Sequence, residues 1–272
     1  MLLAAIRLTR VALVLAAGLA AAPLFQVLSL EARSALLRFW AGSLLAALGV
    51  RIRAIGKPTK KPGLVVANHV SWLDVIAIAS VKPTAFVCKS EIAAWPLVGW
   101  LLKRVGTIFI RRGSFRDVWR VMLRVRSRMA AAQSVAVFPE GTTTIGREVL
   151  EFRRALFEPA SQLGLPVFPV ALAYSSEAAS YTGTTSFLQS LVSIAGARKL
   201  EVHIALLSPI EGRGLARREL ALRSRERIAA RLPGLRLEPE EGSDPQGETG
   251  DRRADRGAGQ HVARIVQAEH HA

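Results

Sequence analysis

Short apolar runs alternate with helical patterns through the middle of the chain. Six runs indicate strands: 64–67, 85–88, 107–110, 135–138, 167–172 and 202–207. Residues 92–105, 115–132 and 154–163 carry apolar positions at helical spacing between them. Because such alternation is typical of α/β domains, we predict a mostly parallel mixed sheet flanked by helices. In these sheets, ligand sites form at loops that leave the carboxyl ends of strands.

The N-terminal region is more apolar than the rest. Residues 11–30 form an uncharged run of twenty residues, which suits a helix that crosses about 30 Å of hydrocarbon. A second apolar stretch, 39–50, is too short to span and carries Trp40 near its start. We therefore expect N-terminal membrane-anchoring helices over residues 1–56, either as a re-entrant hairpin or as one span and an interfacial helix. The alternative is a secretory signal peptide that ends near the small residues 20–22.

Two composition shifts bound the predicted α/β domain. Residues 57–63 contain two prolines and three lysines, as expected for a linker that leaves the anchor. From residue 235 onward the chain is rich in Glu, Gly, Asp and Arg. We predict one domain over 57–234 and a disordered polar tail over 235–272.

The predicted helix 115–132 has two stripes. One is apolar, and the opposite one contains arginines at every fourth position. That second stripe is either a solvated face or a contact with lipid phosphates. The apolar positions are Phe115, Val118, Met122, Val125 and Met129, and the basic ones are Arg112, Arg116, Arg120, Arg124 and Arg128.

The charge balance narrows the possible partners. The chain has 37 basic and 21 acidic residues, a net charge of +16, which suits nucleic acid, an anionic membrane or phosphate-bearing substrates. Two tyrosines and few other aromatic residues argue against a base-stacking platform. The single cysteine, Cys88, excludes an internal disulfide framework and a cysteine-rich metal site.

The segment Asn68-His69-Val70-Ser71-Trp72-Leu73-Asp74 directly follows a predicted strand. On an unbroken helix, side chains five residues apart would point about 140° away from each other. His69 and Asp74 can therefore meet only if His69 lies in the loop and the helix begins after it. A neutral imidazole could then take a proton from a hydroxyl, while the carboxylate fixes its tautomer.

Two further segments leave predicted strands. In Phe138-Pro139-Glu140-Gly141-Thr142-Thr143, Gly141 permits close backbone approach and Thr142 adds a hydroxyl, so the loop could hold an oxyanion or a phosphate. Glu140 could accept a hydrogen bond from a substrate hydroxyl or hold a cation, and a capped turn is the structural alternative. The segment 106–112 ends in Arg111 and Arg112, where a guanidinium suits bidentate phosphate recognition.

Together these segments resemble the 1-acylglycerol-3-phosphate acyltransferases and their lysolipid acyltransferase relatives. NHVSWLD (68–74) matches the Asn-His-x4-Asp block, GTIFIRR (106–112) the second block and FPEGTT (138–143) the third, and 167–170 is similar to the fourth. The resemblance implies a glycerol-3-phosphate acyltransferase-like fold over roughly residues 64–209. It implies that His69 is a general base oriented by Asp74. It also implies that acceptor binding involves Lys89, Arg112, Glu140, Gly141, Thr142 and Pro169.

The activity implied is transfer of a fatty acyl group to 1-acylglycerol-3-phosphate, which gives phosphatidic acid. The donor would be acyl-CoA or acyl carrier protein as co-substrate, with no cofactor and no metal. The site would face the cytoplasm at the bacterial inner membrane, whose anionic surface is a further partner, and no nucleic acid is expected. Lyso-ornithine lipid or another lysolipid is the alternative acceptor, because this chain has Thr143 where the third block often has arginine and Arg111 where the second often has aspartate.

Two functions of other classes remain open at this point. One is a basic membrane-bound scaffold without activity. Another is a metal-dependent hydrolase in which His69, Asp74 and Glu140 hold the ion. A serine lipase is disfavoured because the chain has no Gly-x-Ser-x-Gly segment.

Overall fold

The computed structural model describes residues 1–111, 115–183 and 185–235 of the 272-residue chain. Within these ranges, seven strands form one sheet in the order β1-β7-β6-β2-β5-β3-β4. All neighbouring pairs are parallel except β6 and β7, so the predicted mostly parallel mixed sheet is confirmed. The strands are β1 (Val50–Ile55), β2 (Leu64–Ala67), β3 (Ala85–Lys89), β4 (Ile108–Ile110), β5 (Val135–Val137), β6 (Val167–Tyr174) and β7 (Leu200–Leu206).

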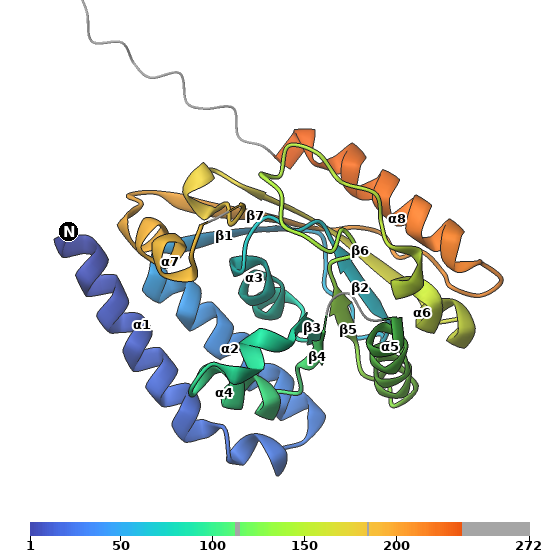
Figure 1. Cartoon of the computed structure of the whole chain (residues 1–272), viewed down its shortest axis with the longest axis horizontal. Coiled ribbons are helices and arrows are strands. Elements are labelled where there is room, and N and C mark those ends of the chain that lie inside the picture. Colours follow the sequence, from blue (N-terminus) through green and yellow to red (C-terminus); the bar gives the residue numbers. More distant parts are fainter. Residues whose placement is uncertain (112–114, 184, 236–272) are drawn as a thin grey trace, which may run out of the picture. The chain divides into compact units, whose positions relative to one another are not determined.

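Helices cover both faces of the sheet (Figure 1). On one face lie α2 (Leu30–Leu48), α3 (Leu73–Val81) and α7 (Phe187–Gly196), whose apolar side chains share one core with the strands. On the other face lie α5 (Phe115–Ala130), α6 (Glu158–Leu163) and α8 (Arg217–Arg231), which enclose a second core. The apolar stripe predicted on α5 is confirmed at Val125 and Met129, which are fully buried.

The N-terminal apolar run divides into two helices. α1 (Leu2–Ala21) ends just before Pro23, a short 3-10 turn (Leu24–Gln26) follows, and Ser29 caps the start of α2 by accepting a hydrogen bond from Ala32 N. Proline removes a backbone donor and interrupts a helix, so the expectation of one continuous helix over 11–30 is wrong. Among the described residues, the helix long and apolar enough to cross a membrane is Leu2–Ala21.

The sheet begins inside the region that the sequence assigned to the anchor. β1 pairs in parallel with β7 over its whole length, from Val50 opposite Leu200 to Ile55 opposite Ala205. Residues 50–55 are therefore part of the α/β domain, and only α1, the turn and α2 precede the sheet. The proposed tail begins at Leu235, which is 2% exposed in a final 3-10 turn, and residues 236–272 lie outside the described residues.

The predicted helix 92–105 is interrupted at Pro96. A 3-10 turn (Ser90–Ala94) precedes extended Trp95, and α4 (Val98–Arg104) begins two residues after the proline. The residue before a proline is disfavoured in the α region, which accounts for the break. The predicted helix 154–163 likewise consists of a 3-10 turn (Arg154–Phe157) followed by α6.

Strand direction determines where the site forms. β2, β5, β3 and β4 are parallel neighbours, so their carboxyl ends lie at one edge of the sheet. The loops that begin at Asn68, Phe138, Ser90 and Arg111 all leave from this edge.

Candidate active site

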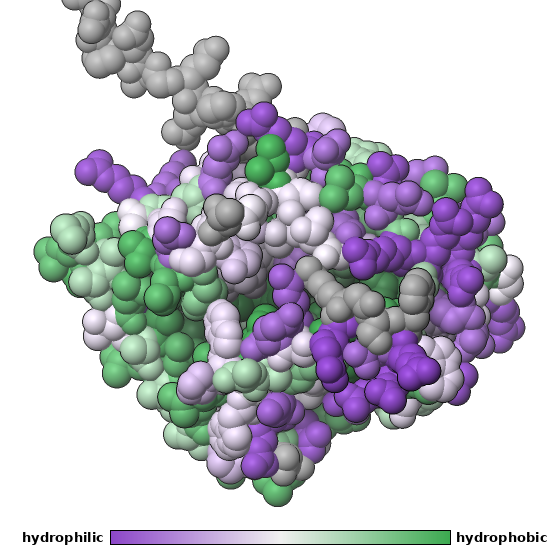
Figure 2. Space-filling view, in the orientation of Figure 1, coloured by the Kyte–Doolittle hydropathy of each residue, from purple (hydrophilic) through white to green (hydrophobic). Residues whose placement is uncertain are grey.

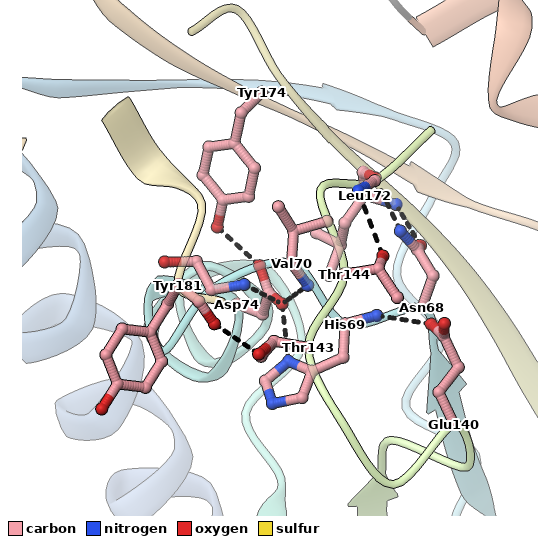
Figure 3. Close-up of polar contacts among 12 residues, drawn as sticks. Asn68, His69, Val70, Asp74, Glu140, Thr143, Thr144, Leu172, Tyr174 and Tyr181 are labelled. Carbon is pink, nitrogen blue, oxygen red and sulfur yellow. Dashed lines mark hydrogen bonds and ion pairs between the residues drawn. The ribbon is translucent and has the colours of Figure 1, made fainter. Parts of the chain in front are cut away.

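His69 and Asp74 meet as the sequence predicted. His69 lies in the loop after β2, α3 begins at Leu73, and His69 Nδ1 is 2.8 Å from Asp74 Oδ2. The other ring nitrogen, Nε2, points away from Asp74 (Figure 3). The imidazole side chain is 16% exposed and stacks on Phe138, with ring centroids 4.0 Å apart. When Nδ1 donates to the carboxylate, the Nε2 lone pair is available to accept a proton.

Asp74 is fully buried and surrounded by donors. Its Oδ2 accepts hydrogen bonds from Val70 N at 2.7 Å and Ser71 N at 3.0 Å, and its Oδ1 accepts from the Tyr174 hydroxyl at 2.6 Å. The carboxylate also lies in the first turn of α3, where the helix dipole favours negative charge. These contacts hold the carboxyl group of Asp74 in a single orientation behind the imidazole.

Tyr174 is a site residue that the sequence did not reveal. It is the last residue of β6, and both burial and the negative charge of Asp74 raise the pKa of its hydroxyl well above its usual value. The hydroxyl therefore stays protonated and donates to Asp74. Its position two residues after the predicted strand 167–172 was the one available signal.

Asn68 anchors the loop to the neighbouring strand. Its side chain is fully buried, donates to Leu172 O at 2.9 Å and accepts from Leu172 N at 2.8 Å. This pair of bonds extends the β2–β6 ladder by one side chain. Asn68 therefore fixes the point at which the chain leaves the sheet, directly before His69.

Glu140 connects two loops and is buried, with 5% exposure. Its Oε1 accepts from His69 N at 2.8 Å (Figure 3), and its Oε2 accepts from Leu150 N at 3.1 Å. Burial raises the pKa of Glu140, and the two backbone donors offset part of that effect. With each oxygen engaged by the backbone, the carboxylate positions the loop that carries His69.

The segment after Glu140 is a tight turn. Gly141 has φ +73°, a conformation that L side chains rarely adopt. Thr142 is exposed, the Thr143 hydroxyl donates to Tyr181 O, and Thr144 N donates to His69 O at 2.8 Å (Figure 3). The turn after Glu140 thus contacts the His69 loop from a second side, through Thr144.

The remaining predicted binding residues lie in different places. Lys89 is the exposed last residue of β3, at the same edge as His69 and opposite Ile110. Arg112 lies outside the described residues, and its neighbour Arg111 is 3.5 Å from Asp117.

Pro169 lies within β6, opposite Val66, and lines a pocket of about 160 Å³. The described residues around that pocket come from segments 57–61, 166–170 and 206–211 and from Lys82. Residues 68–74, which include His69, do not line that pocket.

A metal-dependent reaction and a cysteine nucleophile both find little support in the described part of the chain. There, no group of three or more His, Cys, Asp and Glu side chains is placed to hold a metal ion. The oxygens of Asp74 and Glu140 instead accept hydrogen bonds from N–H and O–H groups. Cys88 packs against the core, and burial raises the pKa of its thiol to about 12, as expected for a structural cysteine.

Comparison with known proteins gives consistent matches. Residues 51–173 match the sequence profile of the family described as Acyltransferase. The chain is 37% identical over 207 residues to a lyso-ornithine lipid O-acyltransferase of Pseudomonas aeruginosa, covering 74% of this chain and 80% of that protein. It is 40% identical over 146 residues to a 1-acyl-sn-glycerol-3-phosphate acyltransferase of Neisseria gonorrhoeae, covering 53% of this chain and 57% of that one.

A solved structure supports the fold. The crystal structure of the 1-acyl-sn-glycerophosphate acyltransferase PlsC from Thermotoga maritima superimposes with a TM-score of 0.56 and 22% identity. The alignment covers 75% of this chain and 80% of that one. The mixed sheet and the helices that cover it thus form an arrangement that a known protein shares.

Proposed function

The chain belongs to the acyltransferase family, and on that premise we propose that it transfers a fatty acyl group from a thioester to the free hydroxyl of a lysolipid. The observation that carries this proposal is the His69–Asp74 pair. Its imidazole is partly exposed at the carboxyl edge of the sheet, and its carboxylate is buried and fully hydrogen-bonded. A positioned base of this kind is what a hydroxyl nucleophile needs near neutral pH.

The geometry supports direct transfer. His69 Nε2 accepts the proton of the lysolipid hydroxyl as its oxygen attacks the thioester carbonyl carbon. Asp74 stabilises the imidazolium that forms. The tetrahedral intermediate then collapses, the carbon–sulfur bond breaks, and the thiolate departs with the proton that the imidazolium returns. No acyl-enzyme forms in this sequence.

Two acceptors have specific support. The similarity to the Neisseria enzyme favours 1-acylglycerol-3-phosphate, with phosphatidic acid as product. The longer similarity to the Pseudomonas enzyme, together with Thr143 in place of arginine, favours lyso-ornithine lipid. Both acceptors present a free hydroxyl on a lipid that carries an anionic group.

The donor and the location complete the proposal. We propose acyl-CoA or acyl carrier protein as co-substrate without a further cofactor, and a site that faces the cytoplasm at the bacterial inner membrane. Figure 2 shows hydrophobic residues gathered on the flank where α1 lies in Figure 1, and hydrophilic residues on the opposite flank. Leu13, Val27 and Phe39, in the N-terminal hairpin, are 66%, 81% and 74% exposed. An exposed apolar surface of this kind fits a bilayer.

The test is a transfer assay with purified protein. Labelled palmitoyl-CoA and palmitoyl-acyl carrier protein are each incubated with 1-acylglycerol-3-phosphate or lyso-ornithine lipid, and the products are resolved by mass. We expect one diacylated product, and His69→Ala should abolish it while circular dichroism stays unchanged. Turnover of His69→Ala close to that of the wild-type protein would overturn the proposed mechanism.

A further inference from the structure

The third block of this chain lacks a cation that its relatives often carry. Thr143 occupies that position, and its hydroxyl donates to the carbonyl of Tyr181. A threonine held in this way brings no positive charge to the turn. An acceptor with an anionic group would still need a cation close to the His69 loop.

Arg153 brings a guanidinium to that turn from a different segment. Its backbone N donates to Pro139 O at 3.0 Å, which places it beside the third block. A Cβ atom built on Gly141 would lie 2.6 Å from Arg153 Cζ and 2.6 Å from its Nε. The guanidinium therefore lies directly over the Gly141 α-carbon, one residue from the carboxylate that holds the His69 backbone.

Arg153 is an exposed residue, and among the described residues its side chain has no hydrogen-bond or ion-pair partner. Nearby arginines differ in this respect. Arg154 Nη2 lies 3.4 Å from Glu151 Oε1, and Arg225 donates to the carbonyls of Val149 and Leu150. Arg153 thus has an available charge.

The backbone that carries Arg153 is held on several sides. Glu140 accepts from Leu150 N, Arg225 binds the Val149 and Leu150 carbonyls, and Phe152 is buried with 3% exposure. A cation on a fixed backbone loses less entropy when it binds an anion than one on a free loop. Arg153 is therefore arranged to bind a ligand at the third block.

We infer that Arg153 binds the anionic group of the acceptor, a phosphate monoester or a carboxylate, and so supplies the charge that Thr143 does not. This inference rests on the proposed function and adds a binding residue to it. A guanidinium can bind either anion through two parallel hydrogen bonds. Gly141 has a second role in this arrangement, because any larger residue would displace the guanidinium.

The test compares Arg153→Gln with Arg154→Gln, which removes the same charge from the adjacent exposed residue. Initial rates are measured against 1-acylglycerol-3-phosphate and against lyso-ornithine lipid with one fixed donor. For the acceptor that the wild-type protein uses, Arg153→Gln should raise KM about tenfold or more, the effect of losing a charge-assisted pair. The donor KM should stay within about twofold, because the inference assigns Arg153 to the acceptor alone.

Arg153→Lys should recover part of the acceptor affinity, because it restores the charge without the planar fork. Equal acceptor KM values for Arg153→Gln and Arg154→Gln would overturn the inference. So would a loss of kcat alone that Arg153→Lys does not restore. If the wild-type protein acylates neither lipid, the proposed function fails and the inference fails with it. That outcome is distinguishable from the other two, because it concerns the wild-type protein and not the variants.

Discussion

Asp74 Oδ2 lies 2.8 Å from His69 Nδ1, and the same oxygen accepts two backbone hydrogen bonds from the loop between them. One atom therefore orients the imidazole and also shapes the loop that presents it. This arrangement explains how residues five positions apart can face each other although a helix begins between them. The orientation of the imidazole and the local fold of the loop depend on the same carboxyl group.

Replacing Asp74 by Asn should lower kcat by about three to four orders of magnitude, the scale seen when a His–Asp pair loses its carboxylate. An amide offers one acceptor oxygen where the carboxylate serves four donors through two oxygens. The imidazole would lose its charge partner, while the acceptor KM should change little. Product formation by mass gives kcat, and a decrease smaller than tenfold would mean that another group orients the ring.

Tyr174→Phe tests the outer contact of the same carboxylate. Phenylalanine keeps the ring and removes the hydroxyl that donates to Asp74 Oδ1 at 2.6 Å. We expect kcat to fall by about 10- to 100-fold, as for other groups that orient a catalytic residue from behind. Tyr181→Phe is the matched control, because Tyr181 contacts this site through its backbone. Equal kcat values for the two variants would contradict the role of Tyr174.

Local pattern was sufficient to predict the parts of the site that directly follow strands. His69 and Glu140 come immediately after apolar runs, so their exit from one edge of the sheet could be inferred from chain order alone. Tyr174 could not, because its contact with Asp74 joins residues 100 positions apart and depends on β6 lying beside β2. The guanidinium of Arg153 over Gly141 likewise depends on how the loop after the third block folds back.

The errors in the predicted fold have similar physical causes. β1 was missed because Arg51 and Arg53 interrupt its apolar pattern, as is common on an edge strand that is solvated on one side. The predicted span 11–30 and helix 92–105 both treated a proline as part of a helix. In each case the structure breaks the helix at that residue, Pro23 or Pro96.

Gly141→Ala should reduce both stability and activity. The residue has φ +73°, which costs an L-residue about 1 kcal/mol, and a new methyl group would displace the Arg153 guanidinium. We expect a lower unfolding temperature and a raised acceptor KM. Gly214→Ala is the matched control, since Gly214 has φ +76° with no atom within 4 Å of the new methyl. A similar rise in acceptor KM in both variants would contradict a local effect at the third block.

Arg7 connects the first helix to the α/β domain, and its loss should weaken that connection. The side chain is 9% exposed and donates to Ala195 O at 3.2 Å and Ala197 O at 2.5 Å, at the end of α7. Arg7→Ala should lower the free energy of unfolding in detergent by about 1.5–3 kcal/mol, the range for hydrogen bonds from a charged donor. Arg10→Ala, at an exposed position of α1, should change it by less than about 0.5 kcal/mol. Equal effects of the two substitutions would mean that α1 is not held through Arg7.

Lys82 provides a prediction about stability and pH. Its ammonium donates to Thr59 O at 2.8 Å and lies 4.5 Å from the centre of the Phe168 ring, and burial lowers its pKa from 10.5 to about 8. The unfolded chain therefore binds this proton more tightly than the folded chain between pH 8 and 10.5. Stability contributed by this group must then rise with pH across that window and stay constant below it. Comparison with Lys82→Met isolates this dependence, because other titrating groups are common to both proteins.

Chemical unfolding in detergent at a series of pH values from 7 to 10.5 measures the difference between the wild-type protein and Lys82→Met. We expect the wild-type protein to gain stability relative to the variant as the pH rises above 8. The exposed neighbour Lys61 serves as control, because Lys61→Met removes a lysine from the same region without removing a buried ammonium. A flat difference for Lys82→Met would show that the buried ammonium titrates as it does in water. The contact with Thr59 and Phe168 would then offset its desolvation completely.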